Sequence, residues 1–349
     1  MKKLSHILFI TPGFPANEKE TETLTYLTTF IKYLKQSNPK IMVTIVALRY
    51  PFVAKKYDWF GCNVIALGAG NGKLKLPIIW LKGLKALSAI HKSNKVDIVN
   101  SLWLKETCLI ASRFCKKNEI PHVCTAIGTE VVKGKFLHSL PLHKLTVVFL
   151  SQFHKKQFAK KAKEKLVISF GYNNHNATIN KERTIDVIGV GWLTKLKNYD
   201  LFIDVMHELT TSRPTIKACI IGGGEEEKHL RTKIERLNLA KNIELTGTLK
   251  NEEVHLLLNK AKVLLHPSSF ESQGFVFSEA QNFGLSIVSK KVGVAAASER
   301  WKIAENKLEM VKAVEQLLQL NYPLNSINNF DVVTTNAEYL ELYHKMLAK

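Results

Sequence analysis

The residues best suited to chemistry lie in the segment 266–284, which reads HPSSFESQGFVFSEAQNFG. Two glutamates, Glu271 and Glu279, stand on either side of Gly274. We expect a helix to open at Gly274 and to end near Gly284. The free N–H groups at such a helix start, together with its dipole, suit a phosphate. Glu279 then lies between one and two turns into the helix, where it suits ribose hydroxyls, while Glu271 reaches toward a sugar. The spacing alone fits two solvated glutamates beside an ordinary strand–loop–helix equally well.

The elements that must position these residues alternate between short apolar runs and amphipathic stretches, the pattern of an α/β protein with parallel sheets. In the first half we expect strands over 6–11, 41–48, 63–67, 97–102, 122–127 and 146–151, and helices over 22–36, 78–92 and 105–118. A second series of strands is expected over 165–171, 185–191, 216–223, 242–247, 262–267 and 286–291. Its helices are expected over 200–212, 225–239 and 251–261, and after Gly274.

Each half has enough strand–helix units for a doubly wound sheet, so we expect two Rossmann-like domains facing a cleft. Ligands of such sheets bind at the carboxyl ends of the strands. The junction falls at a turn-rich stretch after Gly171, which gives a basic N-terminal domain over 1–172 and a second domain over 173–349. The last predicted helix, 334–349, follows a loop-like stretch over 320–333. The sequence leaves open whether this helix packs back on the first domain.

The net charge of +20 is distributed unevenly along the chain. Residues 1–172 contain 28 Lys and Arg against 9 Asp and Glu, whereas the remainder contains 22 against 21. Such an imbalance indicates an anionic partner: a membrane surface, a phosphorylated substrate or nucleic acid. The basic run 153–165 and the series Lys82, Lys85, Lys92 and Lys95 favour amphipathic helices that lie on anionic lipid. No RNA- or DNA-recognition motif occurs, so we expect no nucleic-acid partner.

The remaining composition narrows the location and the chemistry. No apolar run reaches the roughly 20 residues needed to span a bilayer, and the N-terminal apolar run is too short for a signal peptide. The five scattered cysteines fit a reducing compartment. We therefore expect a cytoplasmic protein, or one bound peripherally to the inner face of the plasma membrane. The twelve histidines show no HxH or HExxH spacing, so we expect no metal and no cofactor.

The segment 266–284, with the residues that follow it, resembles the E-x7-E region of the family 4 retaining glycosyltransferases, which have the two-domain GT-B fold. The matching positions are Pro267, Ser268, Glu271, Gly274, Val276, Glu279, Ala280, Gly284 and Val288. Residues 190–206 are similar to the family's diphosphate-binding segment, where Gly191 and Lys197 match but Trp192 stands at the arginine position. Residues 220–230, with Gly224, resemble a segment that flanks the nucleotide.

In the first half, TAIGTE (125–130) resembles a segment of the family whose His and Asp face the reacting sugars. Ile127 stands at the histidine position and Glu130 at the aspartate position. Gly13 is the only glycine of the loop over 11–23, which stands where the family has a Gly-rich phosphate-side loop.

The resemblance implies transfer of a sugar, with retention and without a metal, from a nucleoside-diphosphate sugar to a glycan or lipid-linked acceptor. Bacterial surface-polysaccharide assembly fits this reaction. The implied catalytic residues are Glu271, Lys197 and Glu130. The implied donor-binding residues are Glu279, Gly274, Phe275, Gly224, Gly191 and Gly13. The alternative is a non-catalytic relative that binds sugar nucleotides or glycans, which the departures at Trp192 and Ile127 favour.

Overall fold

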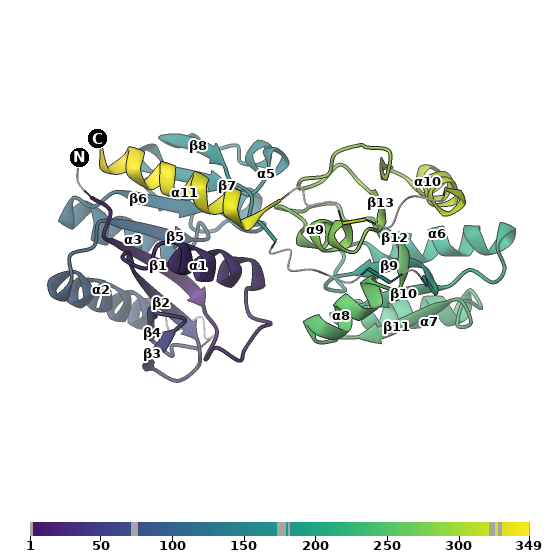
Figure 1. Cartoon of the computed structure of the whole chain (residues 1–349), viewed down its shortest axis with the longest axis horizontal. Coiled ribbons are helices and arrows are strands. Elements are labelled where there is room, and N and C mark those ends of the chain that lie inside the picture. Colours follow the sequence, from purple (N-terminus) through teal and green to yellow (C-terminus); the bar gives the residue numbers. More distant parts are fainter. Residues whose placement is uncertain are drawn as a thin grey trace. The chain divides into compact units, whose positions relative to one another are not determined.

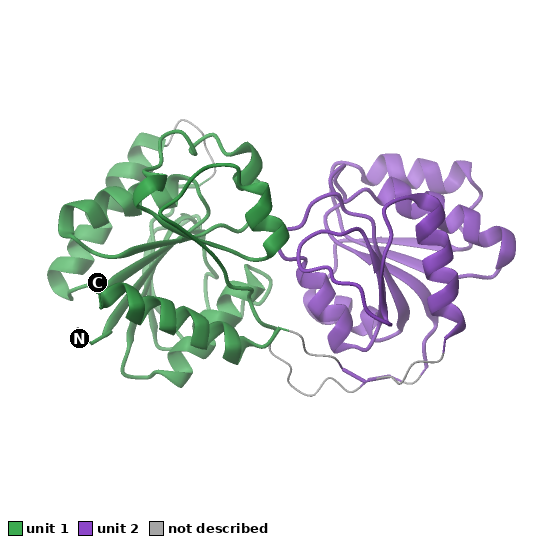
Figure 2. Ribbon diagram, turned by 90° about the horizontal axis from the view of Figure 1, so that it is seen from above, with its two compact units in different colours: residues 1–173, 330–349 green, residues 174–329 purple. Residues whose placement is uncertain are grey.

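The computed structural model describes residues 3–70, 76–172, 179–180, 182–320, 325–326 and 330–348 (Figure 1). The chain forms two compact units. Unit 1 contains Met1–Asn173 together with Phe330–Lys349, and unit 2 contains Asn174–Asn329 (Figure 2). The chain therefore leaves unit 1 and returns to it for its last helix.

Unit 1 is built on an eight-stranded sheet with the strand order β3-β4-β2-β1-β5-β6-β7-β8. Neighbouring strands are parallel except for the antiparallel pair β3 and β4 at one edge. The strands are β1 (His6–Gly13), β2 (Met42–Tyr50), β3 (Lys55–Trp59), β4 (Cys62–Ala66), β5 (Ile98–Leu102), β6 (His122–Thr125), β7 (Thr146–Phe149) and β8 (Glu164–Val167). The helices are α1 (Thr25–Ser37), α2 (Leu76–Ser93), α3 (Glu106–Asn118), α4 (Glu130–Lys133), α5 (Gln152–Gln157) and α11 (Val332–Leu347).

Unit 2 is built on a six-stranded parallel sheet with the order β11-β10-β9-β12-β13-β14. The strands are β9 (Ile185–Val190), β10 (Ala218–Ile221), β11 (Ile243–Gly247), β12 (Ala261–His266), β13 (Ser286–Ser289) and β14 (Trp301–Ile303). The helices are α6 (Tyr199–Ser212), α7 (Glu227–Arg236), α8 (Asn251–Leu258), α9 (Phe275–Asn282) and α10 (Lys307–Gln319). Successive strands run outward from β9 first on one side and then on the other, as in a Rossmann sheet.

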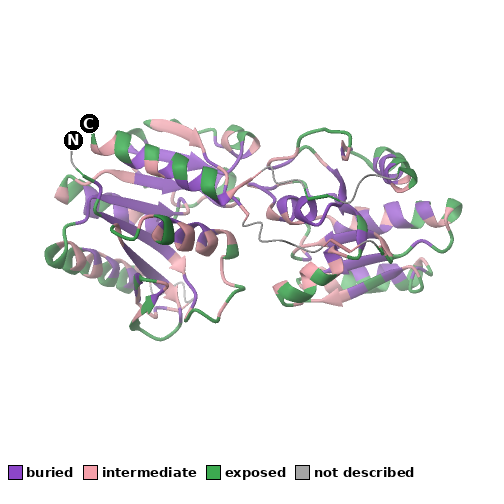
Figure 3. Ribbon diagram, in the orientation of Figure 1, coloured by how far each residue is buried: buried purple, intermediate pink, exposed green. Residues whose placement is uncertain are grey.

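Burial explains why these runs form strands. The central strand β1 is buried over His6–Ile10, and β5 is buried along its whole length (Figure 3). Parallel strands covered by helices on both faces need such continuous apolar runs, unlike the alternating pattern of half-exposed strands. Helices bury one face instead: α6 buries Phe202, Val205, Met206 and Leu209 against the core of unit 2.

The C-terminal helix α11 completes unit 1 (Figure 1). Tyr339 and Tyr343 on this helix are fully buried. The Tyr339 hydroxyl lies 3.0 Å from Thr125 Oγ1, and Asn100 Nδ2 donates to the Tyr343 hydroxyl at 2.8 Å. Where the chain returns, the Tyr172 N–H donates to the Phe330 carbonyl at 2.9 Å.

The prediction of two Rossmann-like α/β domains is confirmed. The prediction that a strand over 165–171 opens the second sheet is wrong, because β8 pairs with β7 at the edge of the first sheet. Strands β3 and β14 were not predicted. Among the residues that the structure describes, no helix is long and apolar enough to cross a membrane.

Candidate active site

The site in unit 2 lies where the direction of the strand order reverses. Strands β9 and β12 are neighbours, yet the strand that follows β9 and the strand that follows β12 lie on opposite sides of this pair. A doubly wound sheet binds its ligand in the crevice at the carboxyl ends of such strands. Lys197 lies in the loop after β9, and Glu271 lies in the loop after β12. The topology therefore brings together two residues that stand 74 positions apart in the chain.

Three side chains form the centre of this site. Lys197 Nζ lies 2.5 Å from Glu271 Oε1, and His266 Nε2 lies 2.8 Å from the same oxygen. The side chains of Lys197 and Glu271 are 20% and 11% exposed, so the ion pair is largely shielded from solvent. Burial by itself raises the pKa of Glu271, but Lys197 and the hydrogen bond from His266 outweigh it and lower this pKa to about 2. Glu271 is therefore ionised at neutral pH.

His266 is the residue whose role the sequence did not reveal. It is the last residue of β12, is fully buried, and packs edge-on against the Phe277 ring. Burial lowers its pKa, against the hydrogen bond to Glu271, which raises it. A neutral imidazole carries one proton, and the bond to a carboxylate requires this proton on Nε2. Its Nδ1 has no hydrogen-bond partner among the described residues. His266 thus donates to Glu271.

The loops that carry Lys197 and Glu271 are joined by hydrogen bonds. The Leu196 carbonyl accepts from the Ser269 N–H at 2.9 Å and from the Ser268 hydroxyl at 3.3 Å. Ser268 Oγ also lies 3.0 Å from the Phe270 carbonyl oxygen. These contacts fix the turn that presents Glu271 to Lys197, which gives a structural reason for the Pro-Ser-Ser sequence after β12.

Gly293 also supports the Glu271 loop, and no pattern in the sequence identified it. It has a left-handed φ of 58°, and a Cβ there would lie 2.1 Å from the Gln273 carbonyl oxygen and 3.0 Å from the Glu271 Cβ. Only glycine fits both conditions without displacing the loop. The contact forms between segments that follow different strands, so only the folded sheet reveals it.

Gly274 precedes α9 and Phe275 is its first residue, as expected. Gly274 has φ 84°, and no side chain caps the helix. Glu279 lies four positions after Phe275, and residues at that spacing share one face of a helix. Glu279 is half-buried as a residue, and desolvation of its carboxyl group raises its pKa to about 7. Within the described residues no side chain or backbone N–H donates to this carboxyl group.

The glycines after β9 and β10 hold these two loops against each other. A Cβ on Gly224 would lie 2.4 Å from the Leu193 carbonyl oxygen, and the Leu193 N–H donates to the Gly223 carbonyl at 2.9 Å. Gly191 donates its N–H to the Ile221 carbonyl at 3.0 Å. The structure thus gives Gly191 and Gly224 a packing role, and their contact with a donor stays a prediction.

Trp192, at the position where the family has arginine, has a side chain that is 70% exposed. Lys195, three positions further along the chain, is exposed as well.

In unit 1, Glu130 is buried at the start of α4. Its Oε1 accepts the backbone N–H of Ile127 at 3.0 Å, and the Gly128 carbonyl lies 3.0 Å from His154 Nε2. This network holds the loop after β6 in shape. The acceptor role of Glu130 stays a prediction.

Gly13 ends β1 and lines a pocket of about 460 Å³ at the carboxyl edge of the unit 1 sheet. Tyr50, Trp103 and Lys105 are among the other residues that line it. Gly13 and Glu130 thus belong to unit 1, and the other predicted site residues belong to unit 2.

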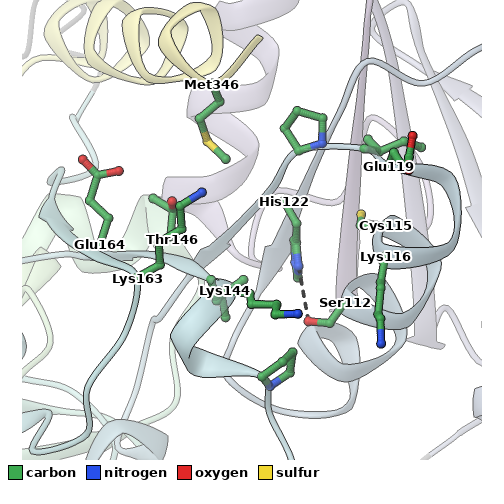
Figure 4. Close-up of a pocket in the computed structure, with 14 residues that line it drawn as sticks. Ser112, Cys115, Lys116, Glu119, His122, Lys144, Thr146, Lys163, Glu164 and Met346 are labelled. Atoms are coloured by element: carbon green, nitrogen blue, oxygen red, sulfur yellow. Dashed lines mark hydrogen bonds between the residues drawn. The ribbon is translucent and has the colours of Figure 1, made fainter. Parts of the chain in front are cut away.

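A different pocket, of about 360 Å³, opens among the amino ends of β6, β7 and β8 (Figure 4). Its His122 lies 2.8 Å from Ser101 Oγ through Nε2 and 3.3 Å from Ser112 Oγ through Nδ1. Burial lowers the pKa of His122 to about 3. A neutral histidine with both nitrogens engaged has a structural role here, and doubly wound sheets bind ligands at the opposite edge.

Two protein-family models match the chain. The model described as "Glycosyl transferase 4-like" matches residues 17–161, and the model described as "Glycosyl transferases group 1" matches residues 172–323. Together they cover most of both units.

Solved structures share the fold across both units. Sucrose-phosphate synthase from Thermosynechococcus elongatus is similar with a TM-score of 0.78 and 15% identity, over 99% of each chain. Anabaena HepE in complex with UDP and glucose is similar with a TM-score of 0.72 and 17% identity, over 98% of this chain and 100% of that one.

Curated relatives match over shorter stretches. The phosphatidylinositol N-acetylglucosaminyltransferase gpi3 subunit of Schizosaccharomyces pombe is 28% identical over 109 residues, 31% of this chain and 24% of its own. The α-monoglucosyldiacylglycerol synthase of Acholeplasma laidlawii is 27% identical over 227 residues, 62% of this chain and 55% of its own. The matched regions thus span between about a quarter and about half of these relatives.

Two Rossmann-like units, with an ion pair at the switch point of the second, define a protein of the GT-B fold. Within that fold class, the chain belongs to the family 4-like glycosyltransferases.

Proposed function

We propose that this protein transfers a sugar, with retention of configuration, from a nucleoside-diphosphate sugar to a glycan or lipid-linked acceptor. The ion pair between Lys197 and Glu271 at the carboxyl ends of β9 and β12 is the observation that carries the proposal. The HepE structure is a complex with UDP and glucose, which supports a nucleotide sugar as the donor.

The ionised Glu271 accepts hydrogen bonds from hydroxyls of the donor sugar, and Lys197 beside it attracts the diphosphate. The start of α9 at Gly274 and Phe275 adds N–H groups and a dipole that favour negative charge. As the glycosidic bond breaks, negative charge develops on the leaving diphosphate. Lys197 and the helix start stabilise this charge without reorganising, which lowers the barrier.

Glu279 binds the ribose of the donor in this proposal. Its carboxyl group lies one helical turn from the phosphate end of α9, and it lacks a partner within the described residues. Two ribose hydroxyls donating to this carboxylate would compensate for its burial.

Metal independence belongs to the same proposal, because Lys197 and the start of α9 supply the positive charge that a cation would otherwise bring. Within the described residues, no group of three or more His, Cys, Asp and Glu side chains is arranged to hold a metal ion. We expect transfer to continue in EDTA.

The proposed acceptor is linked to a membrane lipid, and the protein acts in the cytoplasm at the inner face of the plasma membrane. The names of the two curated relatives refer to phosphatidylinositol and to diacylglycerol. The excess of positive charge over residues 1–172 suits anionic lipid at that surface. Bacterial surface-polysaccharide assembly fits such an acceptor.

A thermal-shift panel of UDP-, GDP- and ADP-sugars identifies the donor, since a ligand at 100 times its Kd stabilises the native state by about 2.7 kcal/mol. Turnover of that donor is then compared in the wild type, Glu271→Gln and Lys197→Ala. We expect each variant to lose about 100-fold in rate, the usual effect of removing one group that stabilises the transition state. Glu235→Gln, an exposed glutamate of α7 in the same unit, is the matched control.

Wild-type rates in both Glu271→Gln and Lys197→Ala would overturn this site. Tight donor binding with neither transfer nor hydrolysis would instead establish the non-catalytic relative.

A further inference from the structure

Unit 1 contains an apolar groove of about 530 Å³ that the proposed reaction does not use. It lies between the first turns of α2, the first turns of α3 and the segment after α4. The apolar residues that line it are Leu76, Pro77, Trp80, Leu81, Ile110 and Phe136. All three elements follow the carboxyl ends of strands, so the groove lies at the same edge of the sheet as Gly13 and Glu130.

The one carboxylate in the lining is already neutralised. Glu106 Oε1 accepts a hydrogen bond from Arg49 Nε at 2.8 Å, and the side chains are only 10% and 18% exposed. An apolar occupant therefore meets no unpaired charge in the groove. Protein partners form about one hydrogen bond per 100–200 Å² of interface, and this lining offers almost no partner for them.

The apolar surface continues out of the groove along α2. Ile78 is 53% exposed and Leu81 is 69% exposed, and their spacing of three residues places them on one face of the helix. Much of α2 is exposed or half-buried (Figure 3). Neighbouring exposed apolar residues, unlike single ones, indicate a binding surface.

Lysines flank this apolar surface. Lys82 and Lys85 follow Leu81 on α2, and Lys133 and Lys135 precede Phe136; all four are exposed. None of them forms an ion pair within the described residues, and α2 contains no Asp or Glu. Exposed apolar residues flanked by lysines in this way suit the interface of an anionic bilayer.

We infer that the groove binds one acyl chain of a membrane lipid, while Lys82, Lys85, Lys133 and Lys135 contact the anionic headgroups around it. The inference rests on the proposed membrane-linked acceptor and specifies where its lipid is held. Phe136 follows the short helix that begins at Glu130, so a chain in the groove places its headgroup at the edge of the sheet that carries the predicted acceptor residue.

Trp80 makes the groove directly observable, because bromine atoms on an acyl chain quench tryptophan emission only at short range. The full-length protein is mixed with phosphatidylglycerol vesicles whose acyl chains are brominated, in the absence of any sugar nucleotide. We expect quenching in the wild type but not in Trp80→Phe. Trp192→Phe is the control, because it removes an exposed tryptophan of unit 2 and should still show quenching. Quenching that persists in Trp80→Phe would overturn the inference.

Leu81→Asp tests the groove without disturbing the core, since Leu81 is exposed. We expect it to weaken vesicle binding at least tenfold and to abolish quenching. Leu256→Asp changes a leucine of similar exposure on unit 2 and should bind as the wild type does. Equal binding by Leu81→Asp and the wild type, or equal binding to phosphatidylcholine and phosphatidylglycerol, would contradict the inference.

The two proposals fail separately. Glu271→Gln should bind vesicles as the wild type does, because Glu271 lies outside the groove. If the wild type transfers sugar but its emission is not quenched by the vesicles, only the inference about the groove is overturned. Normal quenching in a protein that turns over no donor overturns only the proposed reaction.

Discussion

The two glutamates of the site have opposite pKa shifts, and their neighbours explain why. Burial acts on both, but Glu271 has Lys197 and His266 against its carboxylate, and its pKa falls to about 2. Glu279 has no such neighbours, and its pKa rises to about 7. Glu271 therefore stays charged at every physiological pH, whereas the charge of Glu279 changes near neutrality.

Donor binding should consequently depend on pH through Glu279. Ribose hydroxyls donate to the ionised carboxylate, so the donor favours the deprotonated protein and binds more tightly as pH rises. Below pH 7 we expect the affinity to fall by up to about tenfold per pH unit, with a plateau above it. Titration calorimetry between pH 5.5 and 8 measures this directly. Glu279→Gln should bind more weakly and show a flat profile; an unchanged slope in that variant would assign the titration to another group.

The raised pKa of Glu279 also makes the stability of the free protein depend on pH. Stability falls as pH rises, whereas the affinity for the donor increases. The folded state keeps the Glu279 proton up to about pH 7, whereas the ordinary glutamate value is 4.5. The folded state therefore binds more protons between these values, and the free energy of unfolding decreases as pH rises through this window. Glu279→Gln should remove that decrease in denaturant titrations.

His266 should act by orienting Glu271. His266→Phe keeps a ring in the pocket but removes the hydrogen bond, and a hydrogen bond to a charged group contributes about 1.5–3 kcal/mol. We expect donor turnover to fall at least about tenfold, and His266→Gln to restore part of it because its amide N–H can replace Nε2–H. Equal rates in His266→Phe and the wild type would show that Lys197 alone holds Glu271.

Glu271, Gly274, Glu279 and Lys197 could be predicted as site residues because each lies in a short segment of the sequence that resembles a segment of the family. It did not reveal the bond from His266, because a histidine at the end of a buried strand can either pack into the core or bind a neighbouring side chain. The fold decides between these, since the partner Glu271 lies on a loop held in place by Leu196, which lies in the loop after another strand, β9.

Among the elements, the loops after β9, β10 and β12 form one connected support. Hydrogen bonds join the first to the second through Leu193 and Gly223, and the first to the third through Leu196 and Ser269. Lys197 lies in the loop after β9, which takes part in both contacts. A substitution in the loop after β10 should therefore shift the Lys197–Glu271 ion pair.

Gly224→Ala tests this connection. Its Cβ would meet the Leu193 carbonyl oxygen at 2.4 Å, so the loops must separate. We expect a loss of about 1–3 kcal/mol in the free energy of unfolding, together with weaker donor binding. Gly247→Ala is the matched control, since Gly247 also has positive φ but nothing lies within 4 Å of its added Cβ. Equal losses in both variants would mean that φ strain alone, not loop contact, explains the effect.

The elements that the sequence missed share a physical reason. β3 is an edge strand with the charged sequence KKYDW, and β14 has only three residues, so neither shows the buried apolar run of a central strand. β8 is partly buried along its whole length. Its sequence predicts a strand but contains nothing that specifies which of two sheets it joins.

At the scale of the whole molecule, α11 belongs to the core of unit 1. Tyr339→Ala removes a fully buried ring that packs against Phe30 and Phe170. We expect unit 1 to lose about 3–5 kcal/mol of stability, while the thermal shift caused by the donor in unit 2 is retained. Phe202→Ala, in the core of unit 2, should have the converse effect. Urea unfolding with and without the donor separates the two, and a loss of donor binding in Tyr339→Ala would refute this division.

The path of the chain also orders events during synthesis. Residues 174–329 interrupt unit 1, so the ribosome completes this inserted unit before it makes α11. Domains fold as units while the chain emerges. The nucleotide-binding half should therefore mature first, although it comes second in the chain. The first half must wait with the hydrophobic site for Tyr339 and Tyr343 uncovered, which makes it the part of the nascent chain that most needs a chaperone.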